Sequence, residues 1–79
     1  MMDYSYKAIQ QTITDHSKNE LIELAEQYIH HDRNRKIFLD RMLEHPTVEE
    51  LSEKYDITTR RCFDILRECS RIVFRHMIP

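Results

Sequence analysis

The sequence contains no glycine, only two prolines and two cysteines, and no long apolar run. Phosphate-binding loops and nucleophile elbows that depend on glycine are therefore excluded. No segment approaches the roughly 18 to 20 consecutive apolar residues that a membrane-spanning helix needs. The N-terminus MMDYSYK has neither the basic start nor the apolar run of a signal peptide. We therefore expect a cytoplasmic protein that does not have a membrane as a partner.

The few cysteine and histidine residues form no recognisable chemical site. Cys62 and Cys69 are seven residues apart, which is too far along a helix for a disulfide and is not the spacing of a zinc knuckle. His30 and His31 are adjacent, so on a helix they point about 100° apart and cannot chelate one metal ion as an i, i+4 pair does. We expect two buried thiols, no metal site, no cofactor and no enzymatic activity.

The residues that are abundant, among them Glu, Lys, Arg, Leu and Ile, favour helices, and 79 residues suffice for one small domain. We expect an all-α fold, a small helical bundle of four to five helices with a C-terminal helix-turn-helix. Within this single domain, residues 1–14 are expected to form an N-terminal arm or short helix. An arm of this kind can pack on the domain or reach a partner protomer, but its single Lys7 argues against a role in a DNA minor groove. Residues 15–45 are expected to form two supporting helices, and residues 47–76 the helix-turn-helix.

Two capping signals predict where the supporting helices begin. Ser17 and Glu20 form a capping box, so the first helix should begin near Lys18 and run to about His31. Asp32 can cap a second helix over 33–44. The expected core residues are Leu21, Leu24, Ala25, Tyr28 and Ile29 in the first helix, and Ile37, Phe38, Met42 and Leu43 in the second.

Two charged runs in this region each allow two interpretations. The first helix carries Glu20, Glu23 and Glu26 away from its apolar stripe. These carboxylates are either a solvated face or an acidic surface for a basic partner such as a polymerase subunit. The second helix begins with Arg33, Arg35 and Lys36, which are either solvated or in contact with a phosphate beside the main DNA contact.

The segment from Thr47 onward has the pattern of two helices joined by a tight turn. Thr47 and Glu50 form a capping box that starts a helix at Val48. Asp56 tolerates a left-handed backbone and can end that helix. Thr58 can cap the next helix.

A helix-turn-helix needs apolar residues that hold its two helices at a steep angle, and a small residue where they come closest. The apolar positions are Leu51, Tyr55, Ile57, Cys62 and Ile65, and the small residue is Ser52. The second helix is expected to bury Cys62, Ile65, Leu66, Cys69, Ile72 and Val73, and to carry Thr59, Arg60, Phe63, Arg67 and Arg71 on its opposite side. Phe74, Met77 and Ile78 are expected to cover the core or to form an apolar dimer contact.

Charge is distributed unevenly along the chain. The formal net charge of −2 argues against a nonspecific DNA coat. Residues 1–45 carry six basic and eight acidic side chains, whereas the segment 58–76 carries five arginines against Asp64 and Glu68. Positive charge is therefore concentrated on the helix that is expected to enter a groove of DNA.

The stretch from Arg33 to Arg75 resembles the C-terminal DNA-binding region of bacterial sigma factors, which reads the upstream promoter element. The segments DRNRKIFLDRML, TVEELS, DIT and TRRCFDIL carry the resemblance. It implies a free-standing small regulator, of phage or mobile-element type, because nothing here corresponds to the sigma region that binds the polymerase core. A position that is often Arg in that family is Phe63 here, which implies a different base preference, towards apolar contact with a thymine methyl.

We therefore expect a sequence-specific DNA-binding transcriptional regulator whose partners are double-stranded DNA, RNA polymerase and a second copy of the chain. Arg60 and Arg61 would bind guanine edges or phosphates, and Arg67 a phosphate. The full set of expected DNA contacts is Thr47, Thr58, Thr59, Arg60, Arg61, Phe63 and Arg67. The alternative is a helical adaptor that binds RNA polymerase or another regulator without reading DNA; the net negative charge and Asp64 on the reading face favour it.

Overall fold

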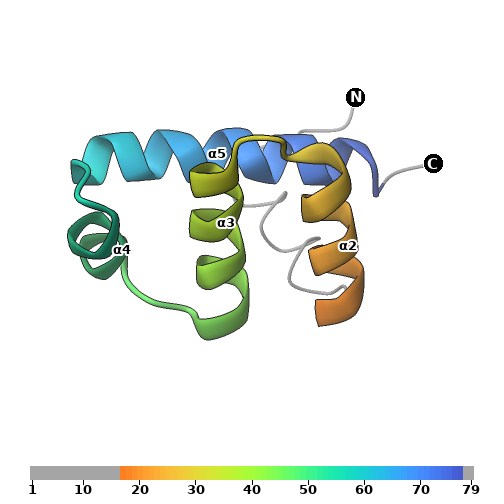
Figure 1. Ribbon diagram of the computed structural model, residues 1–79, viewed down its shortest axis with the longest axis horizontal. Helices are drawn as coiled ribbons and strands as arrows, with labels where there is room; N and C mark the ends of the chain where they lie inside the picture. Colours follow the sequence, from red (N-terminus) through yellow and green to blue (C-terminus); the bar gives the residue numbers. More distant parts are fainter. Residues whose placement is uncertain (1–16, 78–79) are drawn as a thin grey trace, which may run out of the picture.

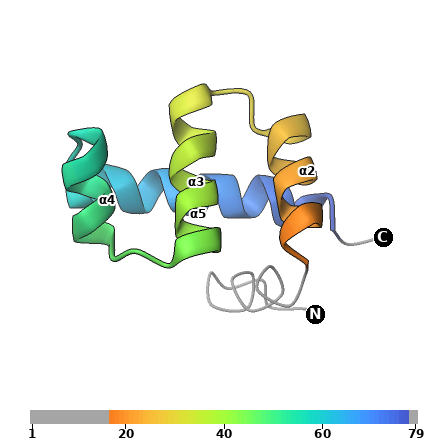
Figure 2. The same ribbon diagram turned by 60° about the horizontal axis from the view of Figure 1, so that its bottom comes forward.

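Helix α5 is the longest element, and the other three helices pack along one side of it (Figures 1 and 2). The computed structural model describes residues 17–77. Within them lie four helices: α2 (Lys18–Tyr28), α3 (Asp32–Glu44), α4 (Val48–Tyr55) and α5 (Thr59–Arg75). No strand occurs in this part of the chain, so the all-α prediction is confirmed. The predicted arm at residues 1–14 lies outside the described residues.

The core forms where α3 crosses α5 and continues between both helices and α2. Ile37 and Phe38 of α3 are fully buried, as are Ile65, Leu66 and Val73 of α5. Their spacing of three or four residues places each set on one face of its helix. The predicted core is confirmed, except that Leu24, Tyr28, Leu43, Tyr55, Ile57 and Ile72 are only half-buried.

Phe74 is buried within this one chain and Met77 packs against the core. The two residues therefore cover the core, which was the first of the two expected roles. Ile78, the third residue of that prediction, lies outside the described residues. Ser70 is also fully buried on the inner side of α5, although the sequence pattern did not mark it.

The link between α2 and α3 is where the predicted boundaries are wrong. Helix α2 ends at Tyr28 instead of His31, and the cap of α3 is His31 instead of Asp32. The Nδ1 atom of His31 accepts a hydrogen bond from the backbone N–H of Asn34 at 3.4 Å. The carboxylate of Asp32 is bound instead by Arg35, whose Nη2 lies 2.6 Å from Oδ1.

Arg35, one of the three residues of the basic run, also makes a second hydrogen bond. Arg35 Nη1 donates to the backbone oxygen of Ile29 at 3.0 Å, which closes the link between the two helices. Arg35 and Arg33 are half-buried, and only Lys36 of the run is exposed. The run is therefore not simply solvated, and its contact with a phosphate stays a prediction.

Candidate nucleic-acid interface

Helix α4 begins at the predicted capping box. Thr47 Oγ1 accepts from the backbone N–H of Glu50 at 3.1 Å, and Glu50 Oε1 accepts from the N–H of Thr47 at 3.0 Å. The bond from the Thr47 backbone, and then that from its hydroxyl, lower the pKa of the exposed Glu50 carboxyl below its usual value. The carboxylate of Glu50 therefore stays at the N-terminus of α4, where the helix dipole favours negative charge.

The turn between α4 and α5 also has the predicted chemistry. Asp56 adopts the left-handed conformation with φ 53° and ψ 52°. The next residue, Ile57, donates its N–H to the oxygen of Ser52 at 3.0 Å, which satisfies a carbonyl at the end of the helix. Thr58 Oγ1 then accepts from the N–H of Arg61 at 3.0 Å and caps α5. Only one residue, Ile57, lies between the left-handed Asp56 and the cap, so the turn that joins α4 to α5 is short.

A small residue lies at the contact between these two helices, as expected. Ser52 is buried and its Oγ donates to the oxygen of Val48 at 2.7 Å. It also lies beside Cys62 of α5: burial raises the pKa of the Cys62 thiol, and a hydrogen bond with Ser52 offsets part of that increase. Leu51 of α4 and Ile65 of α5 are fully buried and belong to the same hydrophobic core.

The side of α5 opposite the core is exposed along its whole length. Its five arginines are all exposed: Arg60, Arg61, Arg67, Arg71 and Arg75. At about 100° per residue they lie within an arc of about 120° around the helix. Two acidic side chains, Asp64 and Glu68, are exposed in the same arc. The surface is therefore mainly basic, with two acidic positions within it.

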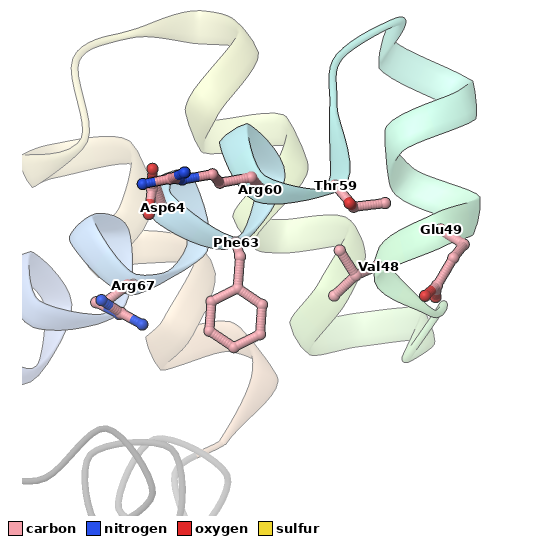
Figure 3. A pocket seen from close by; sticks show the side chains of 7 residues that line it. All are labelled: Val48, Glu49, Thr59, Arg60, Phe63, Asp64 and Arg67. Carbon is pink, nitrogen blue, oxygen red and sulfur yellow. The ribbon is translucent and has the colours of Figure 1, made fainter.

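An open groove lies where the first turns of α4 and α5 meet (Figure 3). Figure 3 shows the Phe63 ring between Arg67 on one side and Val48 on the other. Phe63 is 40% exposed, and the guanidinium carbon of Arg67 lies 5.5 Å from its ring centroid, a cation–π distance. The groove is lined by Val48, Glu49, Thr59, Arg60, Phe63, Asp64 and Arg67.

The structure thus brings four of the seven sequence-predicted contact residues into one groove: Thr59, Arg60, Phe63 and Arg67. The other three do not line it. Thr47 and Thr58 are exposed caps at the starts of α4 and α5, and Arg61 is exposed about 100° around the helix from Arg60.

Two lining residues, Val48 and Glu49, were not predicted as part of the site. The capping box had already placed both in the first turn of α4. The sequence did not say that this turn lies beside the first turn of α5.

A polar cluster holds α4 against α3 at some distance from the groove. Asp40 of α3 accepts hydrogen bonds from the phenol of Tyr55 at 2.5 Å and from Lys54 Nζ at 2.9 Å. Burial alone would raise the pKa of the Asp40 carboxyl. The hydrogen bonds from Tyr55 and Lys54, together with the charge of Lys54, outweigh this effect, so the pKa is lowered below its usual value. Burial and the bond to Asp40 raise the pKa of the Tyr55 phenol.

Both cysteines are free and buried, as predicted. Burial raises the pKa of Cys69 to about 12, and its Sγ lies 3.7 Å from the backbone oxygen of Asn34. A thiol in this environment remains protonated at neutral pH and packs as a small apolar group.

The groove has no metal-binding cluster beside it within the described residues. Residues 17–77 contain no group of three or more His, Cys, Asp or Glu side chains placed to hold a metal ion. No helix in that range is long and apolar enough to cross a membrane. Comparisons with protein-family models, curated proteins and solved structures find no match to the chain.

Proposed function

We propose that the protein is a sequence-specific, double-stranded DNA-binding transcriptional regulator that uses α4 and α5 as a helix-turn-helix. One observation carries the proposal: Thr59, Arg60, Phe63 and Arg67 line one exposed groove at the N-terminal end of a helix whose opposite side is buried. A recognition helix of this class contacts base edges with its N-terminal residues, while the preceding helix crosses the DNA backbone.

Each polar residue at this end has a chemistry that suits DNA. Arg60 can bind the O6 and N7 atoms of guanine, the commonest specific contact in the major groove. We assign Arg61, which is exposed on the neighbouring side of α5, to a phosphate. The hydroxyls of Thr47 and Thr58 accept hydrogen bonds as helix caps, yet each keeps an O–H that it can donate to a phosphate.

The basic row continues beyond the groove. Arg67, Arg71 and Arg75 follow one another at four-residue steps on the exposed side of α5, so they form a ridge along the helix. The 17 residues of α5 span about 25 Å at roughly 1.5 Å per residue, whereas the major groove is about 12 Å wide. The C-terminal half of the helix therefore extends over a DNA strand, and we assign Arg71 and Arg75 to its phosphates.

One unit of this size reads few base pairs, so we propose that it acts as a homodimer or bound to RNA polymerase. Two half-sites double the number of contacts. A polymerase contact would instead hold one unit at one site. Sedimentation of the protein with and without duplex DNA distinguishes these two arrangements.

A second candidate, a helical adaptor that binds RNA polymerase or another regulator, is favoured by the acidic residues of the groove. Glu49 and Asp64 line it together with the arginines, and carboxylates repel phosphates. The exposed Glu20, Glu23 and Glu26 of α2 add an acidic face on another side of the molecule.

Enrichment from a randomised duplex pool over a salt series decides between the two. The DNA function predicts an enriched sequence whose affinity falls as salt rises. Leu51→Arg is the folding control, because a charge at this fully buried position should unfold the α4–α5 unit. If the folded wild-type protein enriches no sequence even at low salt, the DNA function is wrong and the adaptor remains.

A further inference from the structure

Phe63 is the one exposed large hydrophobic side chain among the described residues, and it lies inside the candidate interface. Its surroundings in the groove are mostly charged: Arg60, Arg67, Asp64 and Glu49. Arg67 lies over the ring at 5.5 Å, and Phe63 remains 40% exposed. If the groove binds another molecule, contact with the exposed part of this ring favours an apolar group on that molecule.

Double-stranded DNA offers few such groups. Most of the major-groove edges of the four base pairs are hydrogen-bond donors or acceptors, and the C5-methyl of thymine is the apolar group among them. A modified cytosine with a C5-methyl would present the same group. The surface that Phe63 matches is therefore a pyrimidine C5-methyl.

Asp64 supplies a hydrogen-bond acceptor beside Phe63. An ionised carboxylate only accepts hydrogen bonds, and the donors on the major-groove edges are the N4 amino group of cytosine and the N6 amino group of adenine. Asp64 lines the same groove as Phe63 and follows Arg60 by four residues, so the two lie on one side of the helix. The groove thus presents a donor, an apolar group and an acceptor side by side.

We propose that Phe63 and Asp64 are specificity-determining residues, and that the DNA site contains a pyrimidine C5-methyl against Phe63 beside a cytosine or adenine amino group bound by Asp64. This inference rests on the proposed DNA-binding function. In this role Asp64 lowers the affinity of the protein for phosphates in general and favours bases that present an amino group.

The test for Phe63 removes single methyl groups from the enriched duplex. Each thymine is replaced in turn by deoxyuridine, which keeps base pairing and lacks only the C5-methyl. Wild-type protein should lose about fourfold in affinity at one thymine, the value of one buried methyl-sized group, and little at the others. Phe63→Leu should keep this sensitivity, and Phe63→Ala should bind both duplexes equally.

The Phe63→Ala protein is also the control for changes in DNA flexibility, because such changes would persist without the ring. If an enriched site exists but no deoxyuridine replacement weakens wild-type binding, the assignment of Phe63 is wrong while the DNA function stands. If no site is enriched at all, the DNA function itself fails, so the two failures are distinguishable.

The test for Asp64 repeats the enrichment with Asp64→Ala. The variant should lose the preference at one cytosine or adenine position, and its affinity for unrelated duplex should rise because a negative charge is gone. Enrichment of the same site with the same stringency would overturn the assignment of Asp64. Circular dichroism should show an unchanged fold, since the side chain is exposed.

Discussion

The phenol of Tyr55 donates a hydrogen bond of 2.5 Å to the carboxylate of Asp40, fifteen residues earlier in the chain. Tyr55 is the last residue of α4, and Asp40 lies on α3. The bond therefore holds the end of α4 against a supporting helix just before the turn that places α5. The orientation of the exposed groove depends on this contact as well as on the buried side chains.

Removing the phenol oxygen should weaken the fold. Tyr55→Phe deletes a hydrogen bond to a charged, half-buried acceptor, so the free energy of unfolding should fall by about 1 to 2 kcal/mol. Urea unfolding followed by circular dichroism measures this. The matched control is Lys54→Met, which removes the neighbouring ion pair of an exposed side chain and should have less effect. Equal stability of Tyr55→Phe and the wild type would contradict the role given to this bond.

The same carboxylate should make stability depend on pH in the acid range. The pKa of Asp40 is lowered in the folded state, so its contribution is present above the unfolded pKa of about 3.9 and is lost as pH falls through the folded pKa. The free energy of unfolding of the wild type should therefore decrease below about pH 4. Asp40→Asn should show a smaller decrease over pH 5 to 2.5. A variant with the same pH dependence as the wild type would show that Asp40 does not contribute.

The two threonine caps should contribute similarly to stability. Thr47→Ala and Thr58→Ala each remove an acceptor for a helix N–H and should each cost about 1 kcal/mol. Replacing either residue by Ser should restore most of the loss, because the hydroxyl is kept. Thermal unfolding of the four variants tests this. A loss that Ser does not restore would mean that the methyl group matters and the cap does not.

Cys69 should be inert in the folded protein. Its pKa of about 12, against an ordinary 9.0, reduces the thiolate fraction near pH 8 by about a thousandfold, and the thiolate is the reactive form. In Cys62→Ser, a chromogenic disulfide reagent should therefore label the remaining thiol very slowly until denaturant is added. Labelling of native Cys62→Ser at the rate of the unfolded chain would show that Cys69 is not buried in solution.

The C-terminal half of α5 should affect the strength of DNA binding and leave its sequence preference unchanged. Arg71→Gln with Arg75→Gln removes two proposed phosphate contacts, so the slope of log affinity against log salt should become shallower by about 2. The enriched sequence should stay the same. An unchanged slope would mean that these arginines are exposed to solvent and do not contact phosphates.

Local signals in the sequence predicted most of the fold. The N-caps at Ser17, Thr47 and Thr58 start helices within one residue of the predicted positions. The left-handed residue at Asp56 was predicted because an Asp between two amphipathic segments tolerates that conformation. Each of these features depends on side chains within a few residues of one another.

Features that depend on contacts between distant residues were not predictable in this way. The end of α2 at Tyr28 is set partly by Arg35, which binds the carbonyl of Ile29 from the next helix. The bond between Asp40 and Tyr55, and the position of Val48 in the groove, arise from the way the helices pack. Sequence periodicity indicates which face of a helix is buried, but not which turn of another helix lies beside its exposed face.

We propose that the N-terminal end of α5 reads base edges in DNA. It is tested most directly by titrating the enriched duplex and its single-base variants with Arg60→Ala and Arg61→Ala. Each variant removes one exposed positive charge, and the two positions are adjacent in the sequence. Arg60→Ala should weaken binding by about 1 to 3 kcal/mol and relax the preference at one base pair, whereas Arg61→Ala should weaken all duplexes alike. If Arg60→Ala leaves both affinity and base preference unchanged, or if the wild type enriches no duplex, α5 does not read DNA.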